Sequence, residues 1–255
     1  VISGLTSIGG DNNSGLMISG FMNVTGNMAS GLHFSGVANI TGQSFGGLMA
    51  SGLLNVVGEH MNGLQIAGIA NITASKLNGV QVALCNYATK ARGLQIGLVN
   101  YYKEDMKGFQ LGLVNANPDT KVQMMVYGGN ATPANIGVRF KNQLFYTILG
   151  VGSMYQGLND KFSASASYRA GLSFPLYKGL SISGDLGYQH IEAFDNKDEV
   201  IPKRLYALQA RANLEYQFTK KFGIFATGGY GVTRFYNKSS NYDKGAIIEA
   251  GIVLF

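Results

Sequence analysis

The chain of 255 residues has one cysteine and only four prolines beside 36 glycines. The single cysteine, Cys85, excludes an internal disulfide framework and a cysteine-rich zinc site. It stands where other repeats carry valine, so we expect a small buried apolar side chain there. The low proline content argues against a proline-rich disordered chain and against a collagen-like one.

Charge is scarce as well. Asp, Glu, Lys and Arg make up 13% of the chain, about half the share of an ordinary globular protein. Between Asp11 and Glu59 there is no charged residue at all. A water-facing domain seldom runs so far without charge, so we expect the outer surface of this segment to face something other than water. No apolar run is long enough for a transmembrane helix.

The remaining polar residues offer little chemistry. The net charge is +6, but the basic residues are scattered singly, so we expect no nucleic-acid partner. His33, His60 and His190 lack metal-ligand spacing, and we expect no metal and no cofactor. His190 does lie near acidic residues in the longest charged loop, 190–204, where a barrel enzyme would place a rim site. Those acidic residues are Glu192, Asp195, Asp198 and Glu199. A solvated loop explains them more simply, and we predict a protein that is not an enzyme.

A short motif recurs seven times in the first half of the chain. It opens on glycine and closes seven or eight residues later on asparagine, at a period of 14 to 16 residues. The asparagines are Asn23, Asn39, Asn55, Asn71, Asn86, Asn100 and Asn115. A fixed short period indicates one small structural unit laid side by side many times. Within a unit, Leu64 and Ile66 alternate with Gln65 and Ala67, which predicts a strand.

The second half has no such repeat but a clear alternation of apolar and polar residues. Leu208, Ala210 and Ala212, for example, alternate with Gln209 and Arg211. Aromatic residues stand near both ends of such stretches. Apolar-out, polar-in strands with aromatic ends are typical of transmembrane β-barrels.

The fold class we predict is therefore all-β, an antiparallel transmembrane β-barrel of about sixteen strands. It would form a single barrel over residues 1–255, with a repeat half (1–118) and a non-repeat half (119–255). The strands are expected to begin near residues 1, 14, 30, 46, 62, 78, 92, 107, 121, 134, 144, 162, 180, 205, 222 and 245. About 11 residues per strand, tilted by roughly 40°, span on the order of 28 Å, which suits an outer membrane.

The main alternative is a short parallel β-solenoid over residues 1–118, followed by an eight-stranded barrel over 121–255. Stacked asparagine ladders and coils of variable length suit a solenoid. Against this alternative, a solenoid in water needs a wet outer surface, and this segment offers almost no charge. A soluble all-β protein is a third, less favoured interpretation.

In the barrel interpretation, polar side chains of the strands face the lumen, because isolated charges in lipid are prohibitive. An internal salt-bridge network is favoured over a selectivity ring. The lumen-facing candidates are Gln65, Gln81, Gln95, Gln110, Arg139, Arg169, Asp185, Arg211, Glu215 and Glu249. Apolar neighbours such as Ile66 and Leu214 would face lipid. In the solenoid alternative, Leu64 and Ile66 would instead point into a dry core.

Two late units carry a family resemblance. Gly93-Leu94-Gln95-Ile96-Gly97-Leu98-Val99-Asn100 and Gly108-Phe109-Gln110-Leu111-Gly112-Leu113-Val114-Asn115 resemble the Gly-Val-Gln-Leu-Gly-Leu-Val-Asn repeats of a surface-repeat family of Bacteroidota and spirochaetes. The resemblance covers residues 14–116, and earlier units depart from it at Met17, His33 and Met49. It implies a cell-surface or outer-membrane location and no defined activity.

These observations predict a non-enzymatic β-barrel of the bacterial outer membrane, either a small-solute pore or an accessory subunit of a larger outer-membrane complex. Membrane lipid or lipopolysaccharide, and other outer-membrane proteins, are the expected partners. A barrel enzyme with a site at the rim and a surface solenoid that binds or adheres are the alternatives.

Overall fold

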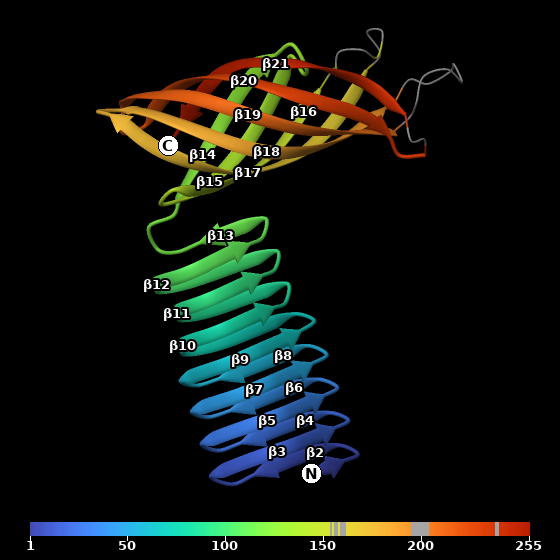
Figure 1. The fold of residues 1–255 in the computed structure, drawn as a ribbon, viewed down its shortest axis with the longest axis vertical. Coiled ribbons are helices and arrows are strands. Elements are labelled where there is room, and N and C mark those ends of the chain that lie inside the picture. The colour runs from blue at the N-terminus through green and yellow to red at the C-terminus, as the bar shows by residue number, and fades with distance from the viewer. Residues whose placement is uncertain (154, 156–157, 159–161, 195–203, 238–239) are drawn as a thin grey trace. The chain divides into compact units, whose positions relative to one another are not determined.

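The computed structural model describes residues 1–153, 155, 158, 162–194, 204–237 and 240–255. The chain divides into two units, Val1–Asp119 and Thr120–Phe255. Every regular element among the described residues is a β-strand (Figure 1). In the same part of the chain no helix is long and apolar enough to cross a membrane.

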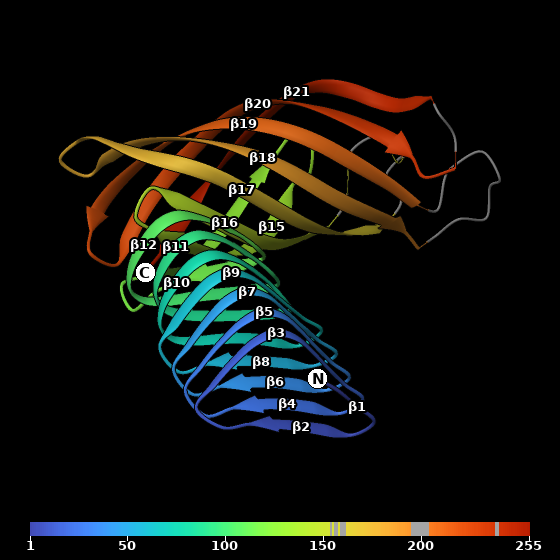
Figure 2. The same cartoon turned by 60° about the horizontal axis from the view of Figure 1, so that its bottom comes forward.

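The first unit is a parallel β-solenoid (Figures 1 and 2). One stack of strands has the order β1-β3-β5-β7-β9, and the other has the order β2-β4-β6-β8. β10, β11 and β12 each run through both stacks, and β13 ends the unit. The bounds are β1 Ile2–Ser3, β2 Thr6–Gly9, β3 Asn12–Ser19, β4 Met22–Thr25, β5 Met28–Ser35, β6 Ala38–Thr41, β7 Ser44–Ser51, β8 Leu54–Val57, β9 His60–Ala67, β10 Ala70–Val82, β11 Cys85–Ile96, β12 Val99–Leu111 and β13 Val114–Ala116.

One sequence repeat makes one coil, so equivalent residues stack in register. Gly31 pairs with Gly47, and Asn39 pairs with Asn55. The glycine that opens each repeat has a structural cause. Gly47 has a φ of 127°, and a Cβ built there would lie 2.2 Å from the carbonyl oxygen of Gly31. Only glycine meets both conditions, which explains why the motif opens on it every time.

The second unit is a closed antiparallel barrel of eight strands, in which β21 pairs with β14. The bounds are β14 Lys121–Gly129, β15 Ala134–Asn142, β16 Phe145–Ser153, β17 Ser163–Tyr177, β18 Leu180–Ala193, β19 Arg204–Thr219, β20 Phe222–Phe235 and β21 Asn241–Leu254. All eight begin within four residues of the positions that the alternation predicts.

The expectation of one sixteen-stranded barrel over 1–255 is thus corrected, and the architecture is that of the alternative. Alternation of side chains is the same in parallel and antiparallel strands, so it does not distinguish a coil from a hairpin. The second, short strand of each coil, such as β4 or β6, was also not expected. Cys85 is exposed on the outside of the solenoid, and the expectation that it is buried is wrong.

The two ends of the barrel differ in the length of their connections. At one end the strands are joined by residues 143–144, 178–179 and 220–221. At the other end they are joined by 130–133, 154–162, 194–203 and 236–240. The chain enters the barrel at Lys121 and leaves it at Leu254, both at the end with the short connections. We call these the short-turn end and the long-loop end.

Candidate functional site

The barrel interior holds a network of ion pairs. Arg169 on β17 donates to Asp185 on β18 through Nε and Nη2, at 2.8 Å each. Only 1% of Arg169 is exposed. The Asp185 carboxylate also accepts hydrogen bonds from the Tyr146 hydroxyl at 2.7 Å and from Asn213 Nδ2 at 2.8 Å. The carboxylate thus accepts four hydrogen bonds, two of them from the guanidinium, and these replace the hydration that it loses on burial.

Two further pairs complete the network. Arg139 on β15 binds both oxygens of Glu215 on β19, at 2.6 and 3.0 Å. Arg211 on β19 binds Glu249 on β21 at 3.1 and 3.2 Å. Glu249 also lies 3.7 Å from Nη1 of Arg169 and so links two of the pairs. Three arginines thus face three carboxylates, and the network is balanced in charge.

The six charged residues that the sequence assigns to the lumen all meet in this network. The four glutamines of the same candidate set lie elsewhere. Gln65, Gln81, Gln95 and Gln110 are buried inside the solenoid, not in a barrel lumen. Alternation assigns each of them correctly to the polar face of its strand. It does not reveal which closed structure that face lines.

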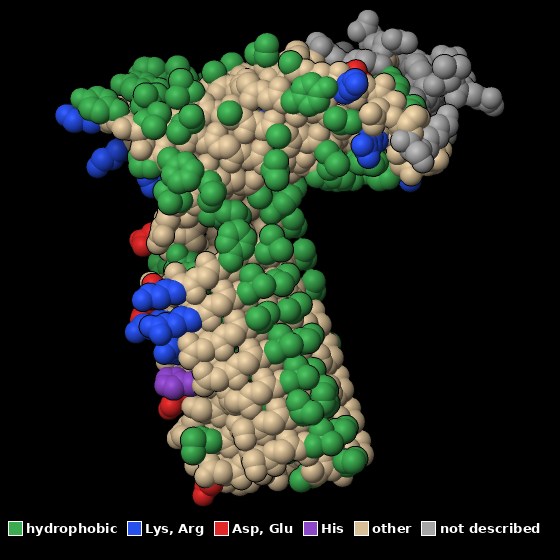
Figure 3. Space-filling view, viewed as in Figure 1, with side chains coloured by type: hydrophobic (Ala, Val, Ile, Leu, Met, Phe, Trp, Pro, Cys, Tyr) green, Lys and Arg blue, Asp and Glu red, His purple; other side chains and the backbone are tan. Residues whose placement is uncertain are grey.

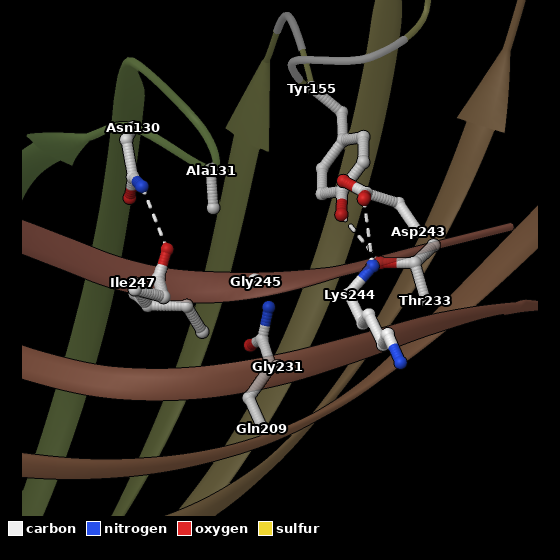
Figure 4. A pocket seen from close by; sticks show the side chains of 11 residues that line it. Asn130, Ala131, Tyr155, Gln209, Gly231, Thr233, Asp243, Lys244, Gly245 and Ile247 are labelled. Carbon is white, nitrogen blue, oxygen red and sulfur yellow. Dashed lines mark hydrogen bonds between the residues drawn. The ribbon is translucent and has the colours of Figure 1, made fainter. Parts of the chain in front are cut away.

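Among the described residues, cavities lie near both ends of the barrel, and two of them share no lining residue. One, of about 460 Å³, is lined by Asn130, Tyr155, Gln209 and Thr233 and by residues 243–247 (Figure 4). The other, of about 440 Å³, is lined by Lys121, Lys141 and Glu215 and by residues of the short-turn end. Gln209 accepts a hydrogen bond from Arg211, and Glu215 binds Arg139. One cavity is therefore bounded by a hydrogen-bond partner of the ion-pair network, and the other by one of its members.

The outer wall of the barrel is apolar. Leu186, Leu208, Leu214 and Ile248 are 49 to 72% exposed, while their strand neighbours Asp185, Gln209 and Glu215 are buried. Aromatic side chains gather at both ends of the wall. Tyr177, Tyr216, Phe218 and Phe222 lie near the short-turn end, and Phe162, Tyr188, Phe194, Tyr206 and Tyr236 lie near the long-loop end. An apolar band between two aromatic girdles is the outer surface that a membrane barrel needs.

His190 takes part in a hydrogen-bonded cluster on this outer wall. Its Nδ1 lies 2.7 Å from the Tyr236 hydroxyl, and its Nε2 lies 3.3 Å from Glu192, which binds Arg204. Tyr236 also bonds to the Tyr188 hydroxyl, and burial raises the pKa of Tyr236 to about 12. Asp195, Asp198 and Glu199 lie outside the described residues.

The solenoid interior is built on polar ladders. Each asparagine of the repeat donates to the next, for example Asn39 to Asn55 and Asn55 to Asn71, both at 2.9 Å. The same amide also donates to a backbone carbonyl, as Asn55 does to Ile66 at 2.7 Å. The glutamines form a second ladder with steps of 2.8 Å from Gln110 through Gln95 and Gln81 to Gln65. These amides satisfy one another away from water.

The glutamine ladder is interrupted in the first coils, where Met17, His33 and Met49 occupy the same register. His33 is 1% exposed and packs edge-on against Phe45, with ring centroids 4.9 Å apart. Its Nε2 has no hydrogen-bond partner among the residues that the structure describes. Burial lowers the pKa of His33 to about 4. The ring is neutral at physiological pH.

The outer surface of the solenoid carries apolar side chains on one side and charged side chains along one edge, with other side chains and backbone between them (Figure 3). The apolar side consists of three outward-facing ladders, two on the longer strands and one at the bend that follows them. They are Leu16, Leu32, Leu48, Leu64, Val80, Leu94 and Phe109; Ile18, Phe34, Ala50, Ile66, Val82, Ile96 and Leu111; and Phe21, Val37, Leu53, Ile69, Leu84, Leu98 and Leu113. The charged edge consists of Glu59, His60, Lys76, Lys90, Arg92, Lys103, Glu104, Asp105 and Lys107.

This arrangement is the reverse of what the solenoid alternative predicted. Gln65 is buried, and Ile66 beside it is 40% exposed. Amides fill much of the interior, and aliphatic side chains cover much of the outside. The absence of charge between Asp11 and Glu59 follows from this, because the outward positions of those coils carry apolar or small polar residues.

Comparison with known proteins adds only fold-level likeness. No protein-family model matches the sequence, and no curated protein matches it. The N-terminal β-barrel domain of Pseudomonas aeruginosa OprF is 16% identical with a TM-score of 0.35, over 52% of this chain and 93% of that chain. Neisserial surface protein A (NspA) is 9% identical with a TM-score of 0.33, over 52% and 92%. At such values neither structure carries an argument about function.

Proposed function

We propose that the protein is a non-enzymatic component of the bacterial outer membrane. The barrel anchors it in the membrane, and the solenoid binds its partners. The observation that carries the proposal is the barrel's polarity. Its outside is apolar between aromatic girdles, and its inside holds Arg139, Arg169 and Arg211 in ion pairs. Strands of nine residues, such as β14, span about 23 Å when tilted by about 40°, close to the apolar band of such barrels.

A filled lumen supports an anchor over a pore. An eight-stranded barrel has an interior just wide enough for side chains. Here the ion pairs lie between the two cavities, together with buried side chains such as Tyr127, Tyr146 and Phe225. The structural role of the lumen charges explains them without a permeating solute. The protein would then be an accessory subunit whose partners bind to its solenoid.

The connections set the direction of insertion. In outer-membrane barrels the short turns face the periplasm and the longer loops face outward. Because the chain passes from β13 to β14 at the short-turn end, the solenoid lies on the periplasmic side in this proposal. A solenoid displayed on the cell surface for adhesion is the less favoured alternative.

Thiol labelling of intact cells tests the orientation. In a Cys85→Ala background, Asn237→Cys places a thiol in a long-loop connection, and Lys178→Cys and Ser30→Cys place thiols at a short turn and on the solenoid. A membrane-impermeant maleimide should label position 237 in intact cells, and positions 178 and 30 only after the outer membrane is opened. Labelling of position 30 in intact cells would put the solenoid at the cell surface.

Planar-bilayer recording distinguishes anchor from pore. The purified full chain should insert without conductance above that of the protein-free bilayer, because the ion-pair network occupies the lumen. Reproducible unitary steps from the wild-type chain would favour the small-solute pore.

A further inference from the structure

The apolar side of the solenoid is too extensive to face water. Three ladders of seven side chains run along seven coils, at about 4.8 Å per coil. Ile69, Leu84 and Leu98 at the bend are each about half exposed, although each is flanked by its ladder neighbours. Contiguous apolar surfaces beyond a few hundred Å² mark a site that something else covers.

We propose that this side lies in the lipid of the membrane that holds the barrel, so that the solenoid is an amphipathic element embedded in the periplasmic leaflet. This rests on the proposed anchor function, and it names lipid as the partner of the solenoid. Since residues 117–120 are the only connection between β13 and β14, the membrane that holds the barrel is within reach of the coils.

The distribution of charge favours lipid over a protein partner. On β11, Lys90 and Arg92 point outward in the middle of the strand, and Leu94 and Ile96 point outward at its carboxyl end. β12 repeats the pattern, with Lys107 followed by Phe109 and Leu111. The charged edge holds five basic and three acidic residues. Basic side chains that border an apolar surface suit anionic headgroups beside acyl chains.

The solenoid interior suits the same environment. Backbone groups of neighbouring coils pair along the stacks, and the asparagine and glutamine ladders satisfy their own amides. An element that enters the boundary of the hydrocarbon layer needs its polar groups paired internally, because lipid offers no hydrogen bonds. The asparagine and glutamine amides meet that requirement, whereas His33 Nε2 and the hydroxyls of Ser35 and Thr41 do not.

Depth-dependent fluorescence quenching of the full chain in vesicles with anionic phospholipid tests the proposal. In the Cys85→Ala background, single thiols at Leu98→Cys on the apolar side, Ser30→Cys on the opposite edge and Leu214→Cys on the barrel wall carry the same fluorophore. Nitroxide-labelled lipid should quench the fluorophore at 98 and 214 several-fold more than at 30. Aqueous iodide should quench mainly at 30.

The outcomes separate this inference from the proposed function. If lipid does not quench the fluorophore at 214, the proposal that the barrel lies in the membrane is wrong. Lipid quenching at 214 with iodide quenching at 98 would mean that the apolar side faces water and would overturn the inference. Protection at 98 from both quenchers would also overturn it, since a second copy or another protein would then cover the side. As a second readout, Lys90→Glu with Arg92→Glu should reduce lipid quenching at 98, and vesicles of neutral lipid should abolish the difference between that variant and the parent.

Discussion

Arg169 and Asp185 lie on neighbouring strands, two residues out of register, and their side chains meet in a bidentate pair deep inside the barrel, at 2.8 Å for both hydrogen bonds. Asp185 is also held by Tyr146 and Asn213, so one carboxylate joins three other strands. The pair therefore ties β16, β17, β18 and β19 together across the lumen.

Removal of one partner of this pair should be severe. Asp185→Ala leaves the Arg169 guanidinium buried without its main partner, and we expect a loss of about 3–5 kcal/mol in the free energy of unfolding. Replacing both charges, with Arg169→Met and Asp185→Leu, should recover a large part of the loss. Urea unfolding in lipid vesicles, followed by far-ultraviolet circular dichroism because the chain has no tryptophan, measures both. Asp243→Ala, at an exposed position, is the control. Equal stability of Asp185→Ala and wild type would contradict a structural role for the network.

Depth in the membrane should set the effect of charge on the barrel's outer wall. Leu214 lies five residues before the short-turn end of β19, about 13 Å into the membrane, and Leu208 lies about 28 Å from that end. Leu214→Arg should cost about 2–4 kcal/mol, as arginine does at the midplane, and Leu208→Arg about 0–1 kcal/mol. The yield of folded barrel after refolding into vesicles reports both. A larger defect for Leu208→Arg would mean that the membrane covers the long-loop end instead.

The barrel was the more predictable unit. Its strands alternate cleanly, and residues such as Arg211 and Glu215 share one face of one strand, so their inward direction follows from the sequence. Their partners do not. Whether Arg139 meets Glu215 or another carboxylate depends on strand tilt and on the closure of β14 against β21, neither of which alternation contains.

The solenoid was predicted only as the alternative, and for an instructive reason. A solenoid in water is expected to keep apolar residues such as Leu64 inside and polar residues outside. Gln65 and Asn71 are both fully buried, because stacked amides satisfy one another from coil to coil. The repeat of the same residue at every strand was the signal for parallel stacking, since it allows each amide to pair with its own copy.

Neighbouring glycines of one coil should respond differently to alanine. Gly47 has a φ of 127° and no room for a Cβ, whereas a Cβ at Gly46 meets nothing closer than 4.0 Å. Gly47→Ala should therefore lower the free energy of unfolding of this coil by several kcal/mol, because backbone strain and a clash with Gly31 add. Gly46→Ala should change it by less than about 1 kcal/mol. Hydrogen–deuterium exchange of peptides from residues 28–67 measures the protection of this coil in each variant. Equal protection in both variants would contradict the close approach of the β5 and β7 backbones at Gly47.

The buried imidazole should make the first coils sensitive to acid. The pKa of His33 is about 4 in the folded chain, because burial disfavours the charged ring, against 6.5 for the free side chain. Between these values the unfolded chain binds a proton that the folded chain does not, so stability falls as the pH decreases from 6.5 to 4. The full loss, below pH 4, is about 3 kcal/mol.

His33→Gln restores the residue type that fills this position from Gln65 onward, and it should remove that acid sensitivity while leaving the fold intact. Hydrogen exchange of peptides spanning residues 28–51, corrected for the intrinsic pH dependence of exchange, should show the opening free energy of the parent falling between pH 6.5 and 4.5. In His33→Gln it should stay nearly level. His60→Gln, at an exposed position on the charged edge, should behave like the parent chain. A parent and a His33→Gln variant with the same pH profile would mean that His33 is charged or hydrated inside the coil, and the neutral, unpaired ring described for it would be wrong.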